Sequence, residues 1–187
     1  VDATRLKFMG TGFPGAFFGD AVTQANTFFT QASLNGNFVF LIGGASNAGP
    51  VATAGRFSTD GGGNVMNVVL DENNSGVHTG LPAGPVTASY TVDANGFGGG
   101  TLTITDSVAG TFSFIFYLAS PGQAVLQETD TGIVSDGAFL AQIGSPINAA
   151  LLAGNYSFNW TGVTLDQEDF SGQLALSNAS PSSVTGT

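Results

Sequence analysis

The stretch LNGNFVFLIGG at residues 34–44 decides the fold, because it returns 118 positions later as LAGNYSFNWTG at residues 152–162. The shared positions are Gly36, Asn37, Phe38, Phe40 and Gly44, which correspond to Gly154, Asn155, Tyr156, Phe158 and Gly162. The same offset holds upstream, where Phe8, Gly19 and Gln24 correspond to Leu126, Gly137 and Gln142. A fixed offset that holds on both sides of one stretch indicates an internal repeat.

The repeat predicts how the chain is divided. Residues 34–142 form one complete β-repeat, with linkers at 25–33 and 143–151, of which the second is the better candidate for a short helix. Residues 1–24 are interpreted as the last two strands of a preceding repeat, and 152–187 as the first two strands of a following one. Val1 is not an initiator Met, so we expect a chain that was processed or that comes from a longer protein.

The complete unit is predicted to be all-β. Turn residues separate eight short runs, at 36–42, 51–59, 64–71, 85–92, 100–106, 110–118, 122–128 and 136–142. Tight turns between consecutive strands imply antiparallel neighbours. The pattern therefore favours a meandering up-and-down barrel or a β-sandwich, and in a barrel the last strand would close against the first. Gly62, Gly63 and Gly96 are expected at turn positions with positive φ.

Composition excludes several classes of function. The net charge is −10, with Arg5, Lys7 and Arg56 as the positive residues, whereas nucleic-acid binding needs clustered cations. No apolar run is long enough to insert into a membrane. The chain has no cysteine, so disulfides and thiolate chemistry are excluded. An acidic chain with little Lys and much Thr, Ser, Gly and Asn is typical of an extracellular or cell-surface bacterial protein, and its 16 Phe supply material for a core.

Several motifs of turn glycines and core aromatics recur along the unit. They are LNGNFVF, AGRFSTDGGGNV, YTVDANGFGGGTLTI, FSFIFYLASPGQAVLQETD and GAFLAQ, at residues 34–40, 54–65, 90–104, 112–130 and 137–142. With these motifs the chain resembles the tandem β-repeat units, each of about 120 residues, of large secreted or surface proteins of environmental bacteria. The resemblance implies fold and repetition. It implies no catalytic residue.

Catalytic chemistry has little support in the sequence. His78 is the single histidine, within the polar segment 75–80, and is interpreted as a solvated loop residue. No nucleophile motif accompanies it. We therefore predict a protein without enzymatic activity, with no catalytic and no cofactor-binding residues.

Carboxylates are the remaining resource for a metal. Asp71, Glu72, Glu128 and Asp130 are weak candidates for calcium ligands, because calcium prefers oxygen-rich loops. The repeat argues against such a site, since Glu128 and Asp130 correspond to glycines at positions 10 and 12. Ordinary turn chemistry is the preferred interpretation, so no cofactor is predicted.

Apolar side chains at both ends are the candidates for an assembly surface. They are Leu6, Phe8, Phe17, Tyr156, Phe158, Trp160, Leu174 and Leu176. Tyr156, Phe158 and Trp160 share one face of a predicted strand. That face suits ordinary core, the lining of a ligand cavity, or contact with a neighbouring copy.

An internal repeat that carries no catalytic motif favours a non-enzymatic structural subunit or module of an extracellular filament, stalk or surface layer. Its partners would be copies of itself, joined head to tail by β-strand complementation. The incomplete ends could instead dock beside the central unit of their own chain. Two other functions stay open: an adhesive surface repeat that binds glycans, and a lipocalin-like barrel that binds a small apolar ligand.

Overall fold

The computed structural model describes residues 4–10, 17–24, 28–81, 86–93, 99–106, 110–144, 149–163, 167–177 and 184–186. The chain divides into two compact units, Val1–Gln142 and Ile143–Thr187. The prediction of an all-β, antiparallel fold is confirmed, since every strand pairing in the described residues is antiparallel. No helix in these residues is long and apolar enough to cross a membrane.

The strands form three sheets. The first unit contains the hairpin β1 (Arg5–Gly10) and β2 (Phe17–Val22), the short 3-10 helix η1 (Gln31–Ser33), and a nine-stranded sheet of β3 (Asn35–Ser46), β4 (Gly49–Asp60), β5 (Val65–Asn74), β6 (Val77–Leu81), β7 (Thr87–Val92), β8 (Gly99–Asp106), β9 (Gly110–Ser120), β10 (Gln123–Glu128) and β11 (Ile133–Ala141). The second unit contains η2 (Ala149–Leu152), β12 (Gly154–Val163), β13 (Gln167–Leu176) and β14 (Val184–Gly186).

The central sheet has one more strand than the sequence predicts. β6 covers most of the segment interpreted as a polar loop, and His78 lies opposite Asn73 of β5. Ser75 and Gly76 have φ of 54° and 88°, so the chain reverses within a tight turn and folds β6 back on β5. The loop assignment of His78 is therefore wrong. It failed because β6 has polar or small residues on most positions and so carries no hydrophobic alternation.

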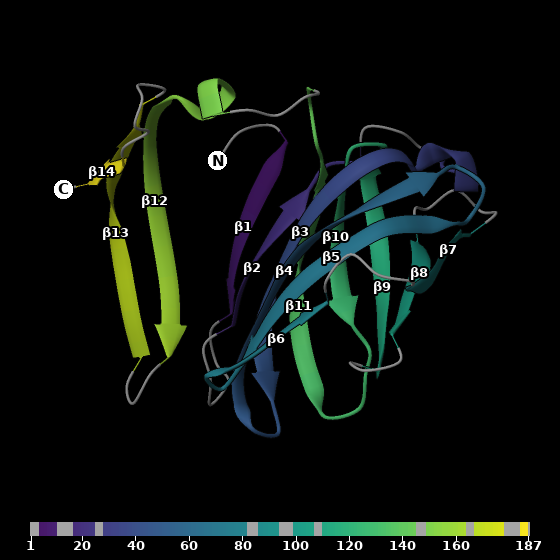
Figure 1. The fold of residues 1–187 in the computed structure, drawn as a ribbon, viewed down its shortest axis with the longest axis horizontal. Helices are drawn as coiled ribbons and strands as arrows, with labels where there is room; N and C mark the ends of the chain where they lie inside the picture. The colour runs from purple at the N-terminus through teal and green to yellow at the C-terminus, as the bar shows by residue number, and fades with distance from the viewer. Residues whose placement is uncertain are drawn as a thin grey trace. The chain divides into compact units, whose positions relative to one another are not determined.

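The central sheet closes between its first and last strands. Its order is β6-β5-β4-β3-β11-β10-β9-β8-β7, so β11 pairs with β3, as expected for a barrel. β6 and β7 end the order, but the sheet curls strongly (Figure 1), and β7 reaches the start of β5 through an Asn64–Ser89 bridge. The Tyr90 amide also donates to the Gly63 carbonyl, with 2.9 Å between nitrogen and oxygen. The result is a partly closed barrel whose seam lies at β6 and β7.

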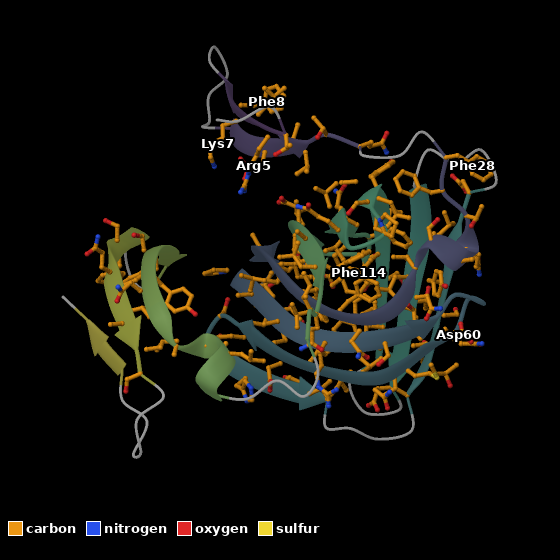
Figure 2. All side chains as sticks on the ribbon, turned by 90° about the horizontal axis from the view of Figure 1, so that it is seen from above. Arg5, Lys7, Phe8, Phe28, Asp60 and Phe114 are labelled. Atoms are coloured by element: carbon orange, nitrogen blue, oxygen red, sulfur yellow. The ribbon has the colours of Figure 1, made fainter. Side chains whose placement is uncertain are left out.

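Phenylalanines fill the interior of this sheet. Phe139 of β11 meets Phe38 of β3 with ring centroids 5.3 Å apart, and meets both Phe57 of β4 and Phe116 of β9 at 5.6 Å. All three contacts are edge-to-face, the arrangement that the ring quadrupoles favour. Figure 2 shows Phe114 among the side chains enclosed by the curved strands. Phe139 therefore joins four strands of the sheet through one buried ring.

The glycine turn between β4 and β5 is only partly as predicted. Gly63 has the expected positive φ of 104°, whereas Gly61, and not Gly62, supplies the other one at 76°. The Asp60 carboxylate explains the difference, because it accepts from the Gly62 amide at 2.7 Å and fixes that residue in the turn. Gly96 lies outside the described residues.

The terminal strands form two sheets of their own. β1 pairs with β2, and β12, β13 and β14 form a three-stranded sheet. Directly after β2, the Gln24 side chain donates to the Leu118 carbonyl of β9 at 2.9 Å. β14 was not predicted, because it is three residues long and lies in a Ser/Thr-rich segment without an apolar pattern. The candidate short helix of the second linker is η2, which precedes β12 as η1 precedes β3.

Replacing Phe139 tests the core. Phe139→Ala removes the ring that contacts three other phenylalanines, so we expect the free energy of unfolding to fall by about 3–5 kcal/mol. Leu140→Ala is the matched control, because its side chain is half-exposed on the opposite face and should change stability far less. Urea unfolding of both variants measures the difference. Equal losses would contradict the inward placement of Phe139.

Candidate assembly surfaces

The N-terminal hairpin has the same strand register as the last hairpin of the central sheet. Phe8 pairs with Gly19 in β1–β2, and Leu126 pairs with Gly137 in β10–β11, at an offset of 118 on both strands. The bounds agree as well, since β1 moved by 118 positions coincides with β10. The hairpin is therefore built like the last two strands of the central sheet.

The C-terminal sheet has the register of the first strands. Tyr156 pairs with Leu174 as Phe38 pairs with Phe57. The offset is 118 on β12 and 117 on β13, which is the one-residue deletion between the two copies of this hairpin. β14 continues the likeness, because it pairs with the end of β13 as the start of β5 pairs with the end of β4.

The apolar face of the N-terminal hairpin is uncovered. Leu6 and Phe8 are 53% and 57% exposed, whereas their counterparts in β10, Ala124 and Leu126, are 0% and 4% exposed. Phe8 stands out from the hairpin in Figure 2. These side chains occupy positions that belong to the core in the complete unit, but here no core covers them. The side chain of Phe17, the third predicted residue, lies outside the described part.

The C-terminal sheet shows a similar contrast. Tyr156 is 40% exposed and its counterpart Phe38 only 1%, although the Tyr156 hydroxyl donates to the Leu152 carbonyl at 2.7 Å. Phe158, Leu174 and Leu176 are partly buried. The side chain of Trp160 is not described. Both ends thus present positions whose counterparts are buried in the central sheet.

The other face of the N-terminal hairpin is charged. Lys7 donates to Asp20 at 2.9 Å, and Arg5 forms a second ion pair with the same carboxylate. The Lys7 and Arg5 hydrogen bonds lower the pKa of Asp20 below its usual value. The Arg5 and Lys7 side chains are well exposed and that of Asp20 is partly exposed, so these ion pairs contribute little to the stability of the hairpin.

The outer face of the central sheet carries an apolar row that the sequence analysis missed. Leu41, Val125 and Tyr117 are exposed on β3, β10 and β9, and the pairings align them through Ala138 of β11. The run FVFLI was the available signal, because a continuous apolar run marks a strand with apolar residues on both faces. An open groove of about 760 Å³ separates part of this face from the charged face of the hairpin.

The four calcium candidates do not all lie together. Asp71 is exposed and lies 3.0 Å from His78 Nε2 across the β5–β6 pair. Glu72, the next residue, points to the other face, and Asp130 accepts a hydrogen bond from the Ser113 amide at 2.9 Å. In the described parts of the chain, no group of three or more acidic or histidine side chains is placed to hold a metal ion.

Glu128 is the exceptional carboxylate, because it is buried in the interior. The Ser135 hydroxyl donates to its Oε2 at 2.6 Å, and Oε1 has no hydrogen-bond partner in the described residues. Burial raises the pKa of Glu128, and the charges of Asp130 and Glu72 raise it further. The corresponding positions in the hairpin are Gly10 and Phe17, so this polar pair is not repeated.

Comparison with known proteins adds no family. No protein-family model, no curated protein and no solved structure matches this chain. The resemblance to tandem β-repeats therefore stays a prediction from the motifs.

The raised pKa of Glu128 predicts a pH dependence of stability. As the pH rises above the ordinary value of 4.5, the unfolded chain loses this proton while the native chain keeps it, so stability falls until the native carboxyl ionises too. Glu128→Gln should remove this part of the slope. Unfolding curves in urea from pH 4 to 8 measure it, with Asp136→Asn as an exposed control. A slope that Glu128→Gln leaves unchanged would contradict the assignment.

Proposed function

We propose that this chain is a non-enzymatic structural subunit or module of an extracellular bacterial filament, stalk or surface layer. Copies join end to end by β-strand complementation. The observation that carries the proposal is the contrast in exposure: Phe8 and Tyr156 are exposed, while Leu126 and Phe38, their counterparts in the central sheet, are buried. The ends have the registers of core strands and lack the core.

Physical chemistry favours covering these ends. An isolated two-stranded hairpin is marginally stable in water, and β1–β2 is such a hairpin in the described structure. Burying a large apolar side chain contributes about 1.5–3 kcal/mol, so covering Leu6, Phe8 and Tyr156 provides a substantial driving force. Unpaired strand edges add backbone hydrogen bonds to the same contact.

The geometry of such a contact supports a filament. The N-terminal hairpin of one copy would meet the C-terminal sheet of the next, so the two surfaces differ. A contact between different surfaces is heterologous, and it propagates unless its rotation closes a ring. A structural role in an extended assembly follows from that property.

A second candidate is the binding of a small apolar ligand, and the groove between the hairpin and the outer sheet face favours it. Tyr117 and Val125 line its sheet side, and Phe8 lines it from the hairpin together with the charged residues Arg5, Lys7 and Asp20, so the groove would suit an apolar ligand with a polar group. The interior of the central sheet is occupied by packed phenylalanines, so a lipocalin-like ligand would be placed in this groove instead. Native mass spectrometry of the purified chain distinguishes this candidate, because a retained apolar molecule would support it.

Deleting residues 1–24 tests assembly. We expect the intact chain to form filaments or oligomers that grow with concentration, and the truncated chain to stay monomeric, since it lacks β1 and β2. Negative-stain microscopy and size-exclusion chromatography measure both. Circular dichroism checks that the central sheet still folds. Normal assembly of the truncated chain would contradict end-to-end complementation.

A further inference from the structure

We infer that β2 of one copy pairs with β12 of the next, antiparallel and in the register of β11 with β3. The two terminal sheets then form one continuous sheet in the order β14-β13-β12-β2-β1. This inference rests on the proposed end-to-end assembly and names its contact: the ligand is a second copy of this chain, and the site is a strand edge.

The topology of the central sheet selects these two edges. β5-β4-β3-β11-β10 is a contiguous block of its strand order. β14-β13-β12 has the registers of β5-β4-β3, and β2-β1 has those of β11-β10. The block is thus present at the two chain ends in two pieces, divided where β3 meets β11. Within the described residues β2 and β12 are the outer strands of their sheets on the sides that correspond to this junction.

Glycines provide an independent argument. β3 and β11 approach so closely that a Cβ on Gly137 would overlap the Leu41 carbonyl oxygen and lie 2.8 Å from Ile42 Cα. A Cβ on Gly44 would likewise overlap the Val134 carbonyl oxygen and lie 2.6 Å from Ser135 Cα. The junction therefore requires glycine on both strands.

The counterparts of these two residues are also glycines, Gly19 on β2 and Gly162 on β12. In the hairpin, a Cβ on Gly19 would meet nothing within 4 Å, so nothing in the hairpin requires a glycine there. Glycine inside a strand weakens it, and often marks a place where another backbone approaches. Pairing with β12 supplies that backbone.

One backbone hydrogen bond extends the junction beyond its last strand pair. In the central sheet the Gln142 backbone N–H donates to the Asn37 backbone carbonyl at 2.8 Å, beyond the last pair of β11 with β3. The counterparts are Gln24 and Asn155, and neither is a proline, so their backbone groups would form the same bond between copies. The central register then sets the predicted pairs between copies, which include Thr23 with Tyr156, Val22 with Ser157, and Gly19 with Trp160.

Disulfide trapping tests the register, and the absence of native cysteine gives a clean background. Val22→Cys and Ser157→Cys are made in separate chains, which are mixed and oxidised. Directly opposed residues have Cα atoms about 4.5–5.5 Å apart, within the range of a disulfide. We expect a covalent heterodimer on a non-reducing gel. Val22→Cys mixed with Asn155→Cys is the matched control. Asn155 lies two residues from Ser157 on the same face of β12, so its Cα would be about 7–8 Å from that of Val22 and the pair should cross-link poorly.

The outcomes separate this inference from the proposed function. Intact chains that stay monomeric at every concentration overturn both. Chains that assemble but give no Val22–Ser157 heterodimer, or cross-link better through Asn155, overturn the register alone. A double variant that links within one chain at high dilution, with no linked dimer at any concentration, overturns the second copy as the occupant.

Gly19→Val gives a second, non-covalent test. A β-branched side chain fits the isolated strand, so thermal stability should stay the same or rise. The same side chain would collide with the backbone of β12, and association should weaken by at least about tenfold. Gly43→Val is the control, because a Cβ there meets only the Val51 carbonyl oxygen, at 3.8 Å, and the position is exposed in β3.

Gly19→Ala adds a single methyl group, a smaller side chain than that of valine, and perturbs the hairpin least. Sedimentation velocity measures association of all three variants. A graded loss from Gly19→Ala to Gly19→Val, with normal assembly of Gly43→Val, supports the β2–β12 junction. Unchanged association of Gly19→Val overturns it.

Discussion

The pairing of β3 with β11 is the constraint on which the rest of the structure depends. It joins residues 35–46 to 133–141 across nearly the whole central unit, so its formation carries a large loop-closure cost. Two features stabilise it: Gly44 and Gly137 let the backbones approach, and Phe139 packs its ring against Phe38 and two other phenylalanines. Because this junction is internal, the sheet ends at β6 and β7 instead.

The same junction explains the organisation of the chain ends. If the chain is a series of repeats, as the 118-residue offset predicts, the last hairpin of one unit directly precedes the first hairpin of the next. In the proposed assembly β2 and β12 each supply one half of such a junction, and Leu6 and Phe8 of β1 and Tyr156 of β12 are exposed beside it. Within the central sheet the two halves belong to one chain. At the ends they suit a second chain, and this is the physical basis of the proposed assembly.

The features that repeat along the chain are residues that determine packing, whereas a buried polar pair occurs in the central unit alone among the compared positions. The close-approach glycines and the core aromatics return at fixed offsets, whereas the buried Glu128–Ser135 pair is replaced by Gly10 and Phe17 in the N-terminal hairpin. Burying an ionised carboxylate costs free energy, so a buried Glu128 is stable only when it is neutral. This buried acid belongs to the central unit and is not repeated in the hairpin.

The sequence by itself determined the all-β class, the 118-residue offset and most strand positions, because alternation, turn glycines and repetition are local signals. It also placed Phe8 and Tyr156 on apolar faces. Tertiary structure decided what local signals do not carry: β6 formed from a polar segment by pairing with β5, and β14 formed from three residues by pairing with β13. It also decided that the seam lies at β6 and β7, that Glu128 is buried, and that Gly137 needs to be glycine while Gly19 has open space. β6 and β14 depend on pairing with the strand directly before them, which a hydrophobic pattern does not report. The seam, the burial of Glu128 and the close approach at Gly137 depend on which distant backbone lies alongside, a property of strand pairing across the whole sheet.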